Sequence, residues 1–98
     1  MKQRIVPVWV QRGGFMNKDI EKAIGANIRI LRECRGITQE GLAAKLQLSG
    51  LDITRSAVAK IEVGQRHIYP DEMMAIKNVL SVTYDEIYEN IKNQVCDT

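Results

Sequence analysis

The stretch that decides the fold covers residues 36–64, GITQEGLAAKLQLSGLDITRSAVAKIEVG. Thr38 and Thr54 each precede a run of apolar residues at helical spacing, and a threonine at such a place caps the free amides of a helix N-terminus. The inward-facing positions of the two runs are Leu42, Ala43, Leu46, Val58 and Ile61. Between the runs the period breaks, as it does in a turn. The stretch therefore predicts two short helices, the second running from Arg55 to about Val63.

Helical patterns continue on both sides of this stretch. Upstream, an apolar stripe is formed by Ile20, Ile24, Ile28 and Leu31. Downstream, Pro70 suits the first turn of a helix whose stripe is Met73, Ile76, Val79 and Leu80. The run Thr83–Glu86 is a capping box, and it opens a fifth helix with the stripe Ile87, Tyr88, Ile91 and Val95. We therefore expect an all-α, compact five-helix bundle.

Length and composition limit the number of domains and the class of protein. The chain has 98 residues, which is enough for one core; 45% are hydrophobic and 27% charged, as is ordinary for a globular protein. No apolar run approaches the roughly 20 residues needed to cross a bilayer, and no secretory signal is evident. Cys34 and Cys96 are expected to be free thiols in a reducing cytoplasm. We therefore expect a cytoplasmic protein without a membrane partner.

Residues 1–15 differ from the rest of the chain in their pattern of apolar residues, which shows no helical period. They end in Arg12-Gly13-Gly14 just before Phe15 and Met16. Possible codons for that run are rich in purines and would serve as a bacterial ribosome-binding site ahead of a start codon. One hypothesis is that Met16 is the native start and that 1–15 is a translated leader. The alternative is a genuine N-terminal arm. The folded unit is expected within residues 16–98.

The formal net charge is only +2, but the charges are unevenly distributed. Residues 68–98 carry two basic side chains against six acidic ones, so the basic excess lies before residue 68. This asymmetry would let one face meet an anion while the other stays in water.

The middle of the chain resembles the lambda-repressor/Cro-like (XRE-type) helix-turn-helix family, of prokaryotic or phage type. The resemblance covers about residues 24–88. It rests on Ile28–Arg32, Gly36–Gln39, Leu42-Ala43, Leu46, Ser56–Glu62, Gly64, Pro70–Leu80 and Val82–Glu86. It implies sequence-specific binding of double-stranded DNA by a transcriptional regulator, a repressor by preference, with the helix after Thr54 in the major groove.

The resemblance also implies roles for individual residues. Arg32 and Glu62 would form a largely buried ion pair with a structural role. Base contacts would come from Thr54, Arg55, Ser56, Ala59 and Lys60, with Arg55 suited to a bidentate contact with guanine. Phosphate contacts would come from Thr38, Gln39, Gln65, Arg66 and His67.

In one place the sequence departs from the family pattern. The connection Gln47–Ile53 is about five residues longer than the usual tight turn. Either Leu51 and Ile53 pack the additional loop against the core, or the preceding helix runs on to Gly50. The two alternatives would set the angle of the DNA-reading helix differently.

An enzyme is not expected, because no phosphate-binding loop, zinc-protease motif or nucleophile elbow is present. No metal, cofactor or small-molecule ligand is indicated. The rival function is a protein-interaction module on the same fold, such as an antitoxin or anti-repressor. Its motivation is the apolar strip Tyr84, Ile87, Tyr88, Ile91 and Val95. In the DNA-binding interpretation this strip is a homodimer seam; alternatively Ile87 and Ile91 close the protein's own core.

Overall fold

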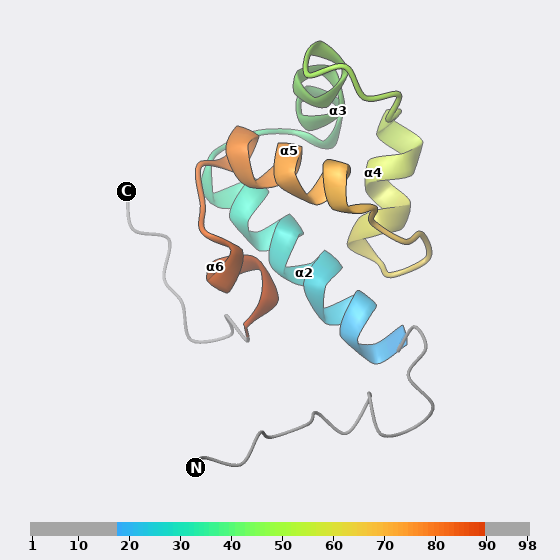
Figure 1. Cartoon of the computed structure of the whole chain (residues 1–98), viewed down its shortest axis with the longest axis vertical. Helices are drawn as coiled ribbons and strands as arrows, with labels where there is room; N and C mark the ends of the chain where they lie inside the picture. The colour runs from blue at the N-terminus through green and yellow to red at the C-terminus, as the bar shows by residue number, and fades with distance from the viewer. Residues whose placement is uncertain (1–17, 90–98) are drawn as a thin grey trace.

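The computed structural model describes residues 18–89, and this part of the chain is all-helical. Its helices are α2 (Lys18–Cys34), α3 (Gln39–Leu48), α4 (Arg55–Glu62), α5 (Pro70–Leu80) and α6 (Tyr84–Tyr88). Figure 1 shows α5 in front of the upper part of α2, with α3 above it, α4 on one side and α6 on the other. The prediction of an all-α bundle with five helices is confirmed for the described residues.

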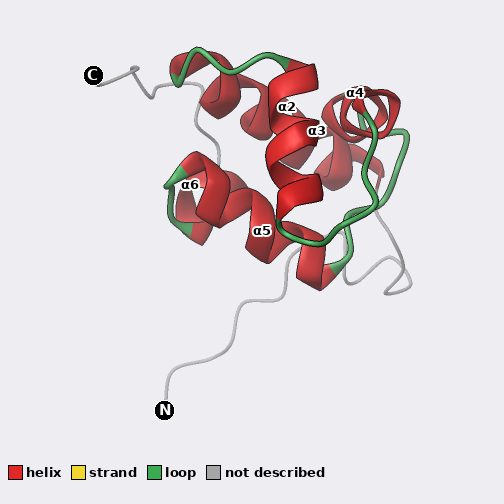
Figure 2. Ribbon diagram, turned by 90° about the horizontal axis from the view of Figure 1, so that it is seen from above, coloured by secondary structure: helices red, strands yellow, loops and turns green. Residues whose placement is uncertain are grey.

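A single core holds the helices together. Its buried members come from every helix and from two connections: Ile28, Leu31, Leu42, Ala43, Leu46, Ile53, Val58, Ile61, Met73, Ile76, Leu80, Val82 and Ile87. Helix α2 packs against α4 and α6, and α3 packs against α4 and α5. Figure 2 shows α4 nearly end-on beside α3. One long face of α4 therefore stays free while the opposite face is anchored.

Helices α2 and α4 cross closely at Gly25. A Cβ atom built on this residue would lie 2.1 Å from the carbonyl oxygen of Ile61 and 2.9 Å from that of Glu62. Only a glycine lets the backbone of α2 approach the last turn of α4 so closely. This contact explains a glycine inside a helix, where it otherwise costs about 1 kcal/mol relative to alanine.

The long connection between α3 and α4 has a defined, hydrogen-bonded conformation. Helix α3 ends at Leu48, and Gly50 follows with a φ of +96°. The amide of Gly50 donates to the carbonyl of Gln47 and the amide of Leu51 to that of Leu46, the Schellman arrangement that closes a helix. Of the two alternatives, the packed loop is therefore correct, because Leu51 lies against the core and Ile53 is fully buried.

Two further interactions fix where α4 begins. The side-chain amide of Gln47 donates to the carbonyl oxygen of Ile53 at 2.8 Å. The hydroxyl of Thr54 then accepts the amide of Ala57 at 3.1 Å, as predicted for a cap. The additional residues therefore hold the start of α4 in place.

The last helix corrects the sequence prediction. Helix α6 ends at Tyr88, and its C-cap residue Glu89 has an extended backbone. The reason is Asn27 on α2, whose side-chain amide donates to the carbonyls of both Ile87 and Glu89 at 2.7 Å. Ile87 itself is fully buried in the core of its own chain, so it does not belong to an exposed seam.

Several predictions fall outside the described residues. These are the leader or arm at 1–15, Ile91 and Val95. Cys34 is disulfide-bonded, which corrects the expectation that it is a free thiol. The other cysteine of the sequence, Cys96, also lies outside the described range. Among the described residues, no helix is both long enough and apolar enough to span a bilayer.

Candidate nucleic-acid interface

A buried ion pair fixes α4 from behind. The Arg32 guanidinium on α2 donates to Glu62 on α4 through Nε at 2.6 Å and through the second terminal nitrogen at 3.1 Å. Both side chains are almost completely buried. Arg32 also donates to the carbonyl of Ile37 at 2.7 Å. The hydrogen bond to Glu62 raises the pKa of Arg32 despite the opposing effect of burial. The pair therefore joins α2, α4 and the turn before α3.

The same carboxylate also holds the start of α3. Gln39, the first residue of α3, donates from its side-chain amide to Glu62 at 3.0 Å. The hydroxyl of Thr38 accepts the amide of Gly41 at 2.9 Å. Both side chains expected at a phosphate are thus already engaged within the chain. What remains at this end of α3 is its backbone, because the first amides of a helix have no partner within the helix.

The free face of α4 carries most of the residues expected at base edges. Arg55, Ser56 and Lys60 are exposed, and Ala59 is half-buried. Thr54 is exposed too, although its hydroxyl serves as the cap of the helix. The opposite face is buried through Val58, Ile61 and Glu62. The structure therefore brings the expected base-reading residues together on one face.

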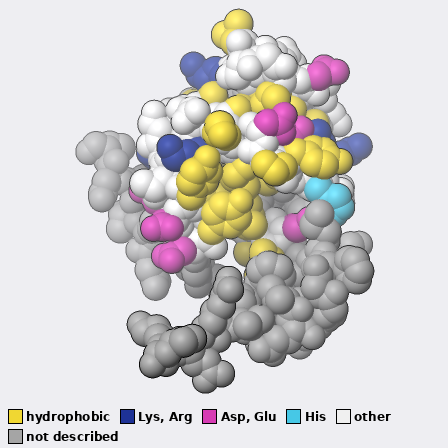
Figure 3. Space-filling model, viewed as in Figure 1, with side chains coloured by type: hydrophobic (Ala, Val, Ile, Leu, Met, Phe, Trp, Pro, Cys, Tyr) yellow, Lys and Arg dark blue, Asp and Glu magenta, His cyan; other side chains and the backbone are white. Residues whose placement is uncertain are grey.

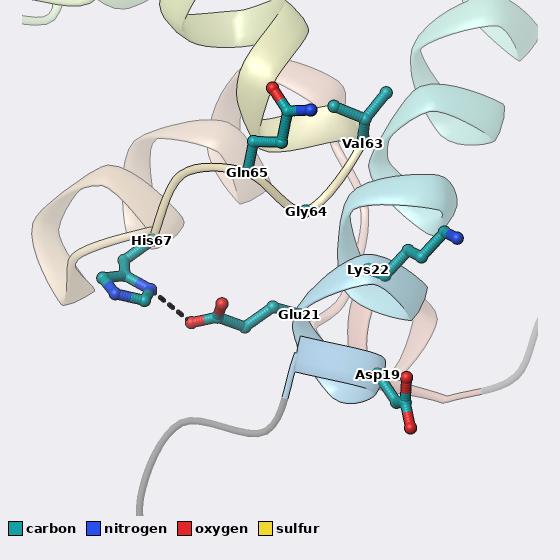
Figure 4. A pocket seen from close by; sticks show the side chains of 7 residues that line it. All are labelled: Asp19, Glu21, Lys22, Val63, Gly64, Gln65 and His67. Atoms are coloured by element: carbon teal, nitrogen blue, oxygen red, sulfur yellow. Dashed lines mark hydrogen bonds and ion pairs between the residues drawn. The ribbon is translucent and has the colours of Figure 1, made fainter.

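The residues that follow α4 are arranged differently from the expectation. Arg66 forms a bidentate pair with Glu72 on α5, at 2.9 and 3.0 Å, and donates to the carbonyl of His67. The Nδ1 of His67 meets the carboxylate of Glu21 on α2, as Figure 4 shows. Gln65 is exposed. Of these three expected phosphate ligands, two are already held by carboxylates of the same chain.

The pair between Arg66 and Glu72 shifts the pKa values of both side chains. Hydrogen bonding to Arg66 lowers the pKa of Glu72, and it raises the pKa of Arg66 in turn. Glu72 also accepts the backbone amide of Tyr69 at 3.0 Å, which caps the start of α5. The loop after α4 is therefore closed by a charged clamp with a structural role.

The basic side chains divide into two classes. Arg29, Arg32 and Arg66 form ion pairs, and Arg35 donates to carbonyls at the end of α5. Three others on α3 and α4, exposed and without an ion pair or hydrogen bond among the described residues, are Lys45, Arg55 and Lys60. A cation that its own chain leaves unpaired is available to an anionic partner.

Sequence reasoning missed several positioning residues. Asn27 and Gln47 gave no signal, because each acts on the backbone of a distant or irregular segment. Gly25 gave no signal of its role either, because a glycine inside a helix is unfavourable by its own propensity. Glu72 could have been found, since a glutamate three residues after a candidate cap is the second half of a capping box.

Comparison with known proteins agrees with this geometry. The chain matches the model of the helix-turn-helix family over residues 28–87. The crystal structure of the DNA-binding domain of BldD superposes with a TM-score of 0.64 at 20% sequence identity; the alignment covers 76% of this chain and 100% of that chain. No curated protein matches the sequence. The chain belongs to the helix-turn-helix family of DNA-binding transcription regulators, and its fold is that of a DNA-binding domain rather than of an enzyme.

Proposed function

We propose that this protein is a sequence-specific repressor that places α4 in the major groove of double-stranded DNA. The observation that carries the proposal is the asymmetry of α4. Its inner face is fixed by the Arg32–Glu62 pair, while its outer face presents unpaired Arg55 and Lys60. An α-helix fits the major groove, and a helix held rigidly from behind reads base edges at low entropic cost.

Arg55 is the proposed principal base contact. It stands at the first position of α4, and its guanidinium can donate two hydrogen bonds to guanine. Ser56, Ala59 and Lys60 lie further along the helix and complete the base-reading face with Thr54. Contacts made here would set the preferred sequence.

Phosphate contacts are proposed for the start of α3 and for the segment after α4. Around Thr38 and Gln39 the donors would be backbone amides, since both side chains are engaged. Gln65 is the free side chain of the second group. Arg66 and His67 remain proposed phosphate contacts, although each already pairs with a carboxylate of the same chain, Arg66 with Glu72 and His67 with Glu21.

Repression is preferred over activation for a simple reason. A domain that occupies promoter DNA blocks transcription by that alone, whereas activation requires a further contact with the transcription machinery. DNA as the target also favours the cytoplasm of a prokaryotic cell as the compartment.

A homodimer is proposed through the face of α5 and α6. Tyr84 and Tyr88 are 42% and 53% exposed, and Met74 adds to the same side. Figure 3 shows apolar side chains gathered on this face, over α5 and α6. A two-fold dimer would direct two copies of α4 to half-sites about 34 Å apart. The same apolar surface favours the second candidate function, an antitoxin or anti-repressor module whose main partner is another protein.

Selection from random double-stranded DNA, followed by titration of the enriched motif, tests the proposal. We expect a short motif and binding that weakens steeply as salt rises. Arg55→Ala should cost about 1–3 kcal/mol in affinity and relax the preference at one base pair. Arg29→Ala is the control, because Arg29 is also an exposed arginine but pairs with Glu33 on α2. If no motif is enriched and Arg55→Ala changes nothing, the protein-interaction function takes its place.

A further inference from the structure

A hollow of about 460 Å³ opens where α4 ends. Figure 4 shows its two sides: the first turns of α2 on one, and the segment from Val63 through Gln65 to His67 on the other. The hollow lies beyond the helix proposed to enter the groove. Neither Lys22 nor the hollow itself has a role in the contacts described above.

The hollow continues the base-reading face of α4. Ser56, Lys60 and Val63 follow one another at spacings of four and three residues, so they lie along one side of the helix axis. From Ser56 to Val63 the rise is roughly 10 Å. The major groove is about 12 Å wide, so a helix with its first turn at the bases emerges at the groove wall after this distance. The groove wall is the phosphate backbone.

Lys22 is fixed at this place by the backbone. Gly64 has a φ of +80°, and a Cβ atom on it would lie 2.8 Å from the Cα of Lys22. The absence of that Cβ lets α2 lie directly against the end of α4. The position of Lys22 relative to α4 is therefore set by main-chain contact, and only the long side chain remains free to move.

Lys22 carries the positive charge on the α2 side of the hollow. Lys22 is exposed, and its side chain makes no ion pair among the described residues. The Glu21 carboxylate is met by His67, on the opposite side of Figure 4 from the Lys22 ammonium. Asp19 also lines the hollow and lies below Lys22 in Figure 4, on the side away from Gln65 and Val63. Lys22 from α2 and Gln65 from the segment after α4 thus line the same hollow.

We propose that Lys22 and Gln65 together hold a phosphate of the DNA backbone at the edge of the groove that α4 occupies. The site adds α2 to the DNA-binding surface, and the proposal rests on the function proposed above. The ligand is a phosphodiester of double-stranded DNA. The contact carries no sequence information, so it contributes affinity and register rather than specificity.

The test measures affinity for the selected motif as a function of salt, for the wild type, Lys22→Ala and Lys77→Ala. Alanine at position 22 keeps the Cβ next to Gly64, so the fold is preserved. Lys77 is the matched control, because it is a lysine held over the ring of Tyr84 on the α5–α6 side. Each lost phosphate contact lowers the slope of log K against log salt by about 0.9. When salt rises from about 50 to 200 mM, both proteins should lose affinity. The fold-loss for Lys22→Ala should be smaller than that for the wild type, by a factor of about 3.5 for each protomer bound.

A scan with neutral methylphosphonate linkages locates the phosphate. At one position flanking the motif, a neutral linkage should lower the affinity of the wild type and leave the affinity of Lys22→Ala unchanged. For Gln65→Ala the loss of affinity caused by that linkage should be smaller than for the wild type. Equal loss of affinity on the motif and on unrelated DNA supports the proposal. If the wild type binds its motif but Lys22→Ala keeps the full salt slope, the phosphate site is wrong and the proposed function stands. If the wild type binds no DNA, the proposed function fails, and the site fails with it.

Discussion

Individual arginines in this protein have different roles that their residue type does not reveal. Arg32 is buried against Glu62, Arg66 is clamped by Glu72, and Arg55 is left unpaired. Removing one partner of a buried pair leaves an uncompensated charge, at a cost of about 3–5 kcal/mol. Arg32 and Glu62 therefore support the proposed DNA-reading surface, and we expect that neither side chain contacts DNA.

At this scale the Arg66–Glu72 clamp gives a pH-dependent prediction. Hydrogen bonding to Arg66 holds the pKa of Glu72 in the folded chain below its ordinary value of 4.5. The stabilisation from the ionised carboxylate is then fully present above that ordinary value and is lost as the pH falls through the lowered, folded-state pKa. Glu72→Gln should cost roughly 1–2 kcal/mol at pH 7, and the difference from the wild type should shrink below about pH 4.

Urea denaturation across this pH range measures the effect. Glu33→Gln is the control, since Glu33 forms an exposed pair with Arg29, and it should change stability by less than about 1 kcal/mol. A gap between the wild type and Glu72→Gln that stays constant down to pH 2 would contradict the role of the ionised carboxylate.

At the scale of elements, the crossing of α2 and α4 matters more than the propensity of either helix. On propensity alone, Gly25→Ala in the middle of α2 should stabilise the chain by about 1 kcal/mol. The new Cβ would lie 2.1 Å from the Ile61 carbonyl, so the two helices would have to separate. We expect a net destabilisation of about 1–3 kcal/mol, measured by thermal or urea unfolding.

The control for this prediction is Ala26→Gly at the exposed neighbouring position, which should show only the propensity cost of about 1 kcal/mol. Separation of α2 from α4 should also lengthen the contact between Arg32 and Glu62, so DNA affinity should fall in Gly25→Ala and hold in Ala26→Gly. Stabilisation by Gly25→Ala would show that the crossing is looser than described.

At the scale of the whole molecule, two functions are assigned to two sides. The unpaired cations Lys45, Arg55 and Lys60 lie on α3 and α4, and the exposed Met74, Tyr84 and Tyr88 lie on α5 and α6. Self-association through the second side would leave the first free for DNA. One small module buries only a small interface on DNA. A dimer doubles that interface, which favours tight specific binding.

Tyr88→Glu tests the proposed dimer. A carboxylate in the middle of an apolar contact would be buried without a partner, so the variant should elute as a monomer in sizing chromatography at concentrations where the wild type is dimeric. Leu48→Glu is the control, because Leu48 is an 88% exposed apolar residue at the end of α3 and belongs to neither α5 nor α6. A wild type that elutes as a monomer at every concentration would remove this dimer from the proposal.

The helices and their caps could be predicted from the sequence because they depend on neighbours a few residues apart. The spacing of apolar residues and the threonines at positions 38, 54 and 83 mark three helix starts that the structure confirms. The fifth helix was predicted too long, because its end is set by Asn27, sixty residues earlier in the chain. No local pattern contains that hydrogen bond.

The sequence by itself determined the five helices within residues 18–89, most of their limits and the family, since periodicity, capping and motif spacing are local properties of the chain. Only the tertiary structure decided which charged side chains form ion pairs within the protein and which remain available to a partner. Pairing depends on distances between side chains that the fold brings together, such as Arg66 with Glu72 and His67 with Glu21. The same is true of Gly25 and Gly64, whose missing side chains make room for a backbone far away in the sequence.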